Sequence, residues 1–378
     1  MSLILDGSNG ITFPNSSTQA VGFYGFKNRI INGAMVIDQR NAGASVGSGA
    51  STFWAVDRYQ VNESVASKLT AQQTPSATET GYATRVAAGF SNYLAFTSSS
   101  AYSVGSGDYF FFRQRIEGTN SSDLAWGTSA AKTVTLSFWV NASLTGTYSV
   151  MITNTGQART YIASYTVNAA NTWEQKTITI AGDQSGTWLT TTGVGVDVNF
   201  CLGSGSTYTT STLNTWSGNF YLGATGQVNV VSTSGATFYI TGVQLEAGST
   251  ATSFDYRPYG TELALCQRYC FVTGYAATGS QAYAMLGVGY SPSTSAANIN
   301  YSLPVVMRIP PSLTWTGAFS ELNSAATGTV IVANGSRTTS KDAFLTGTYS
   351  AGSAGAGNSA MLNANNSTTW QATFSAEL

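Results

Sequence analysis

Between residues 134 and 202 the chain is a series of short runs in which apolar residues occupy every second position, with turn residues between them. A period of two places alternate side chains on opposite faces of a β-strand. Regular strands with no helix between them favour a jelly roll or similar sandwich. The side chains predicted to face the core are Val134, Leu136, Phe138, Val140, Tyr148, Val150, Ile152, Tyr161, Tyr165, Val167, Ile178, Ile180, Val194, Val196, Val198, Phe200 and Leu202.

Composition independently predicts an all-β chain. Charged residues make up 9% of the sequence, aromatic residues make up 12%, and there are 40 glycines, which is typical of strands joined by many turns. A length of 378 residues gives room for two domains and a terminal arm. The net charge of -1 gives no electrostatic reason to bind nucleic acid or an anionic membrane. The scarcity of surface charge favours association with neighbouring subunits.

We predict four segments: an N-terminal arm (1–26), a jelly-roll-like β-sandwich (27–258), a short helical connector (259–272) and a smaller distal β-domain (273–378). The connector follows a strand that starts at Phe238 and is interrupted by a bulge at Gly242. Thr261 is expected to cap a helix over Glu262–Cys270. Beyond it, residues 299–309 are predicted to form a strand, with Leu303, Val305, Met307 and Ile309 on one face, that ends at two prolines.

The arm contains few apolar side chains. Ile4, Ile11 and Phe13 cannot bury a core, so we expect this segment to become ordered by pairing with its own copies or with another protein. An N-terminal strand that lies on its own domain is the alternative.

The absence of histidine removes Ser-His-Asp triads, Cys-His pairs and histidine-based zinc sites. No Gly-Lys-Ser/Thr sequence is present for a phosphate-binding loop. Cys201, Cys266 and Cys270 are expected to be reduced thiols, and we predict no metal, no cofactor and no catalytic residue. A carboxylate pair, as in glycoside hydrolysis, is the remaining route to catalysis, and the 17 acidic residues leave its members open.

Neither a signal peptide nor a membrane-spanning run is apparent. Residues 1–13 contain an aspartate and two glycines where a signal peptide needs a basic start and an apolar run. We therefore expect synthesis in a cytoplasm, without secretion or membrane insertion.

Several stretches resemble proteins of tailed bacteriophages. GVQLE at 242–246, Tyr-Arg-Pro at 256–258 and ELALCQRYC at 262–270 resemble a segment common in their structural proteins, notably tail fibres. Further resemblances lie at 3–19, 28–41, 56–59, 303–317 and 374–378. LSFWVNAS at 136–143 and SYTVNAANTWEQKTITI at 164–180 are similar to carbohydrate-binding-module-like domains within phage fibres. The resemblance implies a virion location, a homotrimer, docking of the arm on other tail or baseplate proteins, and a receptor-binding tip.

Side chains on the polar faces of the sandwich strands are candidate glycan ligands. Sugar recognition needs an aromatic ring for the pyranose C–H groups and planar polar side chains for the hydroxyls. The candidates are Trp139, Arg113, Arg115, Asp197, Asn199 and Trp173. Packing against a neighbouring subunit, or in the second layer of the sandwich, is the alternative for each.

In the distal domain the candidate tip residues are Arg308, Trp315, Tyr349 and Trp370. Each of them also fits a core or trimer-interface position.

The sequence therefore predicts a non-catalytic virion protein, a tail fibre or related appendage that attaches to host-surface polysaccharide. Two alternatives stay open: a tailspike-like polysaccharide depolymerase, and a purely architectural head or tail decoration or adaptor protein.

Overall fold

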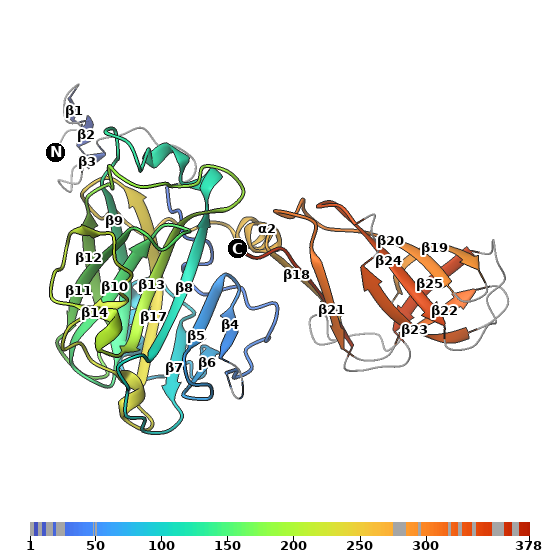
Figure 1. Cartoon of the computed structure of the whole chain (residues 1–378), viewed down its shortest axis with the longest axis horizontal. Helices are drawn as coiled ribbons and strands as arrows, with labels where there is room; N and C mark the ends of the chain where they lie inside the picture. The colour runs from blue at the N-terminus through green and yellow to red at the C-terminus, as the bar shows by residue number, and fades with distance from the viewer. Residues whose placement is uncertain are drawn as a thin grey trace.

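The computed structural model describes residues 4–6, 10–12, 18–19, 27–47, 49, 51–274, 285–293, 296–316, 319–323, 327–334, 338–349, 359–364 and 370–378. Its largest part is a sandwich of two antiparallel sheets, and further antiparallel sheets follow toward residue 378. The predicted all-β fold class is therefore confirmed. Figure 1 shows the sandwich and a smaller distal barrel as two lobes with α2 between them.

The first sandwich sheet has seven strands in the order β15-β11-β10-β13-β8-β5-β4. Neighbouring strands in this sheet come from distant parts of the sequence, as in a jelly roll. The bounds are β4 Thr52–Val56, β5 Tyr59–Glu63, β8 Tyr109–Glu117, β10 Gly146–Thr153, β11 Thr160–Val167, β13 Val194–Ser204 and β15 Trp216–Ser217.

The second sandwich sheet has five strands in the order β12-β9-β17-β7-β6. Its strands are β6 Leu69–Gln73, β7 Leu94–Ser98, β9 Val134–Ala142, β12 Glu174–Ile180 and β17 Thr237–Ala247. A two-stranded parallel pair, β14 Thr209–Thr210 and β16 Gly223–Ala224, lies in the connection after β13.

The inner faces of the two sheets meet in one apolar core. Every side chain predicted to face inward between 134 and 202 lies in this core, except Val194, which is half-buried. Phe112 of β8 stacks on Phe96 of β7 and on Phe200 of β13, with ring centroids 4.5 and 4.9 Å apart. Offset stacking adds to the burial of these large rings and holds the sheets together.

The bulge predicted at Gly242 is present in β17. The register between β17 and β9 shifts between Thr241 and Gln244, and Gly242 has a φ of 62°. The shift returns Val243 and Leu245 to the core, where both are fully buried.

The helix after the sandwich differs from its prediction. α2 spans Tyr259–Gln267, its N-cap is Pro258, and no side chain caps it. The expected cap at Thr261 is wrong, because the helix begins two residues earlier, directly after Pro258. The fixed φ of proline suits the start of a helix. The expected end at Cys270 is also wrong, because Cys270 begins strand β18 and pairs with Ser375.

The other helices are short. They are α1 Tyr82–Ala87 and the single 3-10 turns Gly118–Asn120, Ser122–Leu124, Ser206–Tyr208 and Val230–Ser232.

A three-stranded sheet, β18-β26-β21, and a closed six-stranded barrel, β19-β20-β24-β23-β22-β25, make up the distal lobe. The bounds are β18 Cys270–Gly274, β19 Met285–Ser293, β20 Ala296–Ser302, β21 Ser312–Thr316, β22 Phe319–Asn323, β23 Thr327–Asn334, β24 Asp342–Tyr349, β25 Ser359–Ala364 and β26 Gln371–Ser375. In the arm, β1 Ile4–Asp6, β2 Gly10–Thr12 and β3 Thr18–Gln19 pair with one another.

The strand predicted over residues 299–309 is confirmed up to Ser302 and wrong beyond it. β20 ends at Ser302, and Leu303 and Met307 enter the core of the distal lobe while Ile309 is exposed. Pro304 has no N–H for a sheet hydrogen bond, so the chain leaves the sheet before Pro310 and Pro311 are reached.

A buried polar network joins the sandwich to α2 and to the last residues of the chain. Glu117 of β8 accepts hydrogen bonds from Arg268 Nε (2.9 Å) and Nη2 (2.7 Å) and from the Tyr269 hydroxyl (2.8 Å). The Arg58 guanidinium lies 3.5 Å from the centroid of the Tyr269 ring and forms an ion pair with Glu377. Residues 376–378 are thereby held against the sandwich, and Figure 1 marks residue 378 beside α2.

Candidate functional site

Four of the predicted ligand residues lie side by side on one face of the seven-stranded sheet. In the antiparallel pairing of β8 with β13, Arg113 is opposite Asn199 and Arg115 is opposite Asp197. Their sequence neighbours Phe112 and Phe200 point into the core, so the four polar side chains lie on the outer face. The alternation along each strand predicted the outer face for these side chains. The register of β8 with β13 brings the four residues together.

Two residues that the sequence analysis missed continue this row. Gln60 of β5 is opposite Arg113, and Trp54 of β4 is opposite Gln60. Gln60 Oε1 accepts hydrogen bonds from Arg113 Nε (3.0 Å) and Nη2 (2.7 Å). In the sequence Gln60 lies between Tyr59 and Val61, and this alternation would have placed Gln60 on the outer face. The structure buries both Tyr59 and Val61 on the opposite face.

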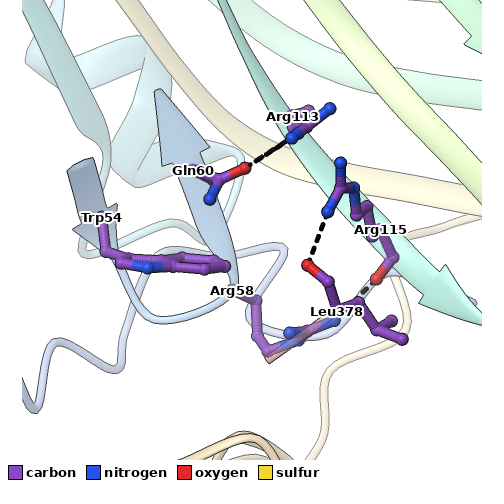
Figure 2. A pocket seen from close by; sticks show the side chains of 6 residues that line it. All are labelled: Trp54, Arg58, Gln60, Arg113, Arg115 and Leu378. Carbon is purple, nitrogen blue, oxygen red and sulfur yellow. Dashed lines mark hydrogen bonds between the residues drawn. The ribbon is translucent and has the colours of Figure 1, made fainter. Parts of the chain in front are cut away.

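The row opens into a shallow recess lined by Trp54, Arg58, Gln60, Arg113, Arg115 and Leu378 (Figure 2). Its empty volume, open solvent included, is about 170 Å³, so the recess is a shallow depression of the surface. Arg115 Nη1 donates a hydrogen bond to the Leu378 carbonyl oxygen at 2.7 Å. The Arg40 guanidinium lies 4.7 Å from the centroid of the Trp54 ring.

The Asp197 carboxylate forms ion pairs with two guanidinium groups, those of Arg113 and Arg115. Its Oδ2 is 3.3 Å from Arg113 Nη1 and 3.4 Å from Arg115 Nε. Burial raises the pKa of Asp197 above its ordinary value, although the charges of both arginines act to lower it. Within the part of the chain that the structure describes, neither Asp197 Oδ1 nor Asn199 Oδ1 has a hydrogen-bond partner, and both atoms are buried. Asp197 is 3% exposed and Asn199 1%, and neither residue lines the recess, so a ligand in the recess does not reach these two atoms in this conformation.

Much of the rest of the face is covered by the chain itself. Leu222, together with the half-buried side chains of Tyr208 and Phe220, packs on a cluster formed by Phe111, Met151, Ile162 and Cys201. The recess is thereby confined to β4, β5, β8 and the last residue of the chain.

Trp139 and Trp173 lie away from this recess. Trp139 is half-buried on β9 of the five-stranded sheet, opposite Gln175. Trp173 is buried and donates its indole N–H to Glu79 Oε1 at 3.1 Å. Together with Tyr93 and Tyr239 they form a separate aromatic cluster, in which Trp173 is buried while Trp139 and Tyr239 are partly exposed.

The distal candidates occupy varied positions. Arg308 donates hydrogen bonds to the carbonyl oxygens of Ala376 (2.8 Å), Glu377 (2.6 Å) and Thr192 (2.9 Å), so it joins the lobes instead of lying at a tip. Trp370 is buried in the distal core, and Trp315 is half-buried against it. The side chain of Tyr349 lies outside the described residues.

No group of three or more metal-ligating side chains occurs within the described ranges. Cys201, Cys266 and Cys270 are buried free thiols, and burial raises the pKa of each. Among the described helices, none has the length and apolar character needed to cross a membrane.

Comparison with known proteins gives matches to solved structures alone, since no family model and no curated protein matches the chain. The enzymatically active domain of bacteriophage CBA120 tailspike protein 4 matches 59% of this chain and 22% of its own, at 12% identity and a TM-score of 0.32. A candidate sugar-binding protein from Bacteroides thetaiotaomicron matches 59% of this chain and 100% of its own, at 14% identity and a TM-score of 0.34. A family 11 carbohydrate-binding module from Clostridium thermocellum, in complex with a mixed-linked tetrasaccharide, matches 55% and 100%, at 10% identity and a TM-score of 0.27. These similarities are too low to carry an argument about function, which has to come from the site.

Proposed function

We propose that this chain is a non-catalytic structural protein of a tailed-bacteriophage virion, a tail fibre or related appendage, and that its sandwich binds a glycan of the host surface. The row Trp54–Gln60–Arg113 carries the proposal, because it sets a half-buried aromatic ring beside amide and guanidinium groups on the outer face of one sheet. A pyranose offers C–H groups to such a ring and hydroxyls to such planar groups. The virion role rests on the resemblance of the segments at 242–270 and 3–19 to phage fibre proteins.

In the assembled particle, the arm docks on other tail or baseplate proteins and the chain forms a homotrimer. A shallow recess binds one saccharide unit weakly, so three or more copies are needed for firm attachment to a polysaccharide. The low charge of the chain agrees with subunits that cover one another.

The proposal is non-catalytic because the carboxylates near the recess are held in ion pairs. Asp197 is paired with Arg113 and Arg115, and Glu377 is paired with Arg40 and Arg58. Glycoside hydrolysis needs two carboxyl groups flanking the bond, roughly 5–10 Å apart. Release of reducing ends from host polysaccharide would instead support the depolymerase alternative.

One observation favours an architectural role. Arg58 and Arg115 both contact the last residues of the chain, so part of this cluster holds the two lobes together.

Adsorption competition distinguishes the functions. The purified full-length protein is incubated with cells of the strain that the phage infects, and adsorption of intact phage is then measured. Under the proposed function the protein blocks adsorption. If correctly assembled protein neither binds the cells nor competes, the chain is an architectural or adaptor part.

A further inference from the structure

One wall of the recess comes from the distal part of the chain. Leu378 lines the recess, whereas the other lining residues belong to the sandwich. Leu378 lies just beyond β26, the central strand of the sheet β18-β26-β21. We call residues 376–378, which lead from β26 to the recess, the strap. The shape of the recess therefore depends on whether the strap is seated on the sandwich.

The strap holds arginine side chains in and beside the recess. Arg115 Nη1 donates a hydrogen bond to the Leu378 carbonyl oxygen at 2.7 Å, and Figure 2 shows this contact inside the recess. Glu377 forms ion pairs with Arg58 and Arg40. Guanidinium N–H groups are also the donors from which a glycan hydroxyl accepts hydrogen bonds. A glycan that uses these donors therefore has to take the place of the strap.

Apolar packing completes the seat of the strap. The Leu378 side chain is half-buried against a cluster formed by Ile31, Ile37, Cys266 and Tyr269. The Ala376 N–H donates a hydrogen bond to the Tyr269 carbonyl oxygen at 2.7 Å. The strap is thus fixed both to the sandwich and to the segment that follows α2, so its displacement would loosen the contact between the two lobes.

Arg58 favours the seated strap when no ligand is present. Its side chain is 1% exposed, and its Nε has no hydrogen-bond partner among the residues that the structure describes. Withdrawal of Glu377 would leave a buried guanidinium charge without its carboxylate, which is strongly unfavourable. A ligand whose hydroxyl oxygens accept hydrogen bonds from the freed arginines offsets part of this loss. Strap and ligand are therefore alternative partners of the same groups.

We propose that the strap is an autoinhibitory contact: while seated it covers part of the glycan site, and glycan binding displaces it and loosens the distal lobe from the sandwich. The proposal rests on the glycan-binding function above and adds its regulation. Coupling between two binding events is reciprocal, so a variant with a weakly seated strap binds glycan more tightly. Capture of host polysaccharide is thereby coupled to a movement of the distal lobe.

Glu377→Gln and Leu378→Ala each weaken one part of the seat. The first removes the ion pairs of Glu377, and the second shortens the side chain that packs on the apolar cluster. Affinity is measured with the full-length protein and surface polysaccharide extracted from the strain used in the adsorption assay. We expect each variant to bind about fivefold more tightly than the wild type. Since loss of folded protein lowers the apparent affinity, destabilisation does not produce this gain.

Glu174→Gln is the matched control. Glu174 is ion-paired with Lys176 on β12 of the five-stranded sheet, so the same substitution changes the net charge equally away from the recess. It should leave the affinity unchanged. Leu378→Ala alters no charge and removes only carbon atoms from a half-buried side chain, so it decides the question alone if Glu377→Gln does not fold.

Hydrogen exchange reports displacement of the strap directly. Because the Ala376 N–H is bonded to the Tyr269 carbonyl oxygen, its exchange rate follows the seat of the strap. Addition of the polysaccharide to the wild-type protein should speed exchange in a peptide spanning residues 370–378 about fivefold and leave exchange in β9 unchanged.

Two results would overturn the inference and leave glycan binding intact. One is unchanged or weaker binding by the two variants when both are folded. The other is slower exchange of the strap in the presence of the polysaccharide, which would make the strap part of the binding surface. If the wild type and both variants fail to bind the polysaccharide and the wild type does not block phage adsorption, the inference and the proposed function fail together.

Discussion

Arg115 and Asp197 face each other across β8 and β13, and the Asp197 Oδ2 that lies 3.4 Å from Arg115 Nε also lies 3.3 Å from Arg113 Nη1. One buried carboxylate thus neutralises part of two guanidinium charges. Removing a buried partner leaves an uncompensated charge, which costs much more than losing an exposed pair.

Asp197→Asn is therefore expected to lower the free energy of unfolding by about 3 kcal/mol. The control is Asp123→Asn, because Asp123 is 49% exposed and pairs with Arg29 at 2.6 Å. That change should cost about 0.5 kcal/mol. Urea unfolding of both variants measures the difference, and equal costs would contradict the buried-pair argument.

Trp54→Ala and Trp139→Ala test which sheet binds the glycan. Both indoles are half-buried on outer faces, but Trp54 lines the recess and Trp139 lies on the other sheet. We expect Trp54→Ala to weaken binding to host cells about tenfold through lost stacking, and Trp139→Ala to leave it unchanged. The reverse pattern in a cell-binding assay would move the site to the five-stranded sheet.

Glu63 should make the protein less stable as the pH rises. Burial raises the pKa of Glu63 from 4.5 to about 7, and its Oε1 is buried without a partner among the described residues. The folded state then holds a proton that the unfolded chain releases, so stability falls between about pH 4.5 and pH 7, by about 3 kcal/mol.

Glu63→Gln tests this dependence. The substituted side chain keeps an acceptor for the amides of Lys68 and Leu69 and does not titrate. Urea unfolding at a series of pH values should give a flatter curve for the variant and higher stability at pH 8. An unchanged slope would show that Glu63 is not the titrating group.

Glu117 is expected to stabilise the contact between the sandwich and α2. Burial raises its pKa, but hydrogen bonds from Arg268 and Tyr269 outweigh this effect and hold the pKa below its ordinary value. Its contribution is therefore present above about pH 4.5 and is lost as the pH falls below that. Glu117→Gln should cost about 3 kcal/mol at pH 7 and expose the chain around Tyr269 to proteases. Unchanged proteolysis and unfolding would contradict this role.

Gly242 is expected to tolerate no side chain. A Cβ at this position would lie 2.5 Å from Phe90 Cζ, and the φ of 62° is unfavourable for other residues. Gly242→Ala should cost about 2–4 kcal/mol through overpacking and strain. Gly248→Ala separates the two causes, since Gly248 has a φ of 120° and no atom within 4 Å of the added Cβ. Equal thermal destabilisation of both variants would remove the overpacking argument.

Most of the sandwich core and two of the six residues that line the recess could be read from the sequence. The alternation in β8, β9, β10, β11 and β13 identified buried side chains and placed Arg113, Arg115, Asp197 and Asn199 on outer faces. The helix over 262–270 was misplaced, and the strand over 299–309 was wrong beyond Ser302. Pro258 set the start of the helix, and the pairing of Cys270 with Ser375 placed Cys270 in a strand. Pro304 follows the end of β20, and Leu303 and Met307 pack into the distal core.

The sequence by itself determined which face each side chain takes, because the period of two is a local property of the strand. Only the tertiary structure decided which faces become neighbours. Gln60 and Arg113 are 53 residues apart, Arg113 and Asp197 are 84 apart, and Arg115 and Leu378 are 263 apart. The same long-range pairing assigned Trp139 and Trp173 to the other sheet and brought Trp54 into the recess. Strand order depends on which distant segments bury apolar surface together, and no local pattern encodes that choice.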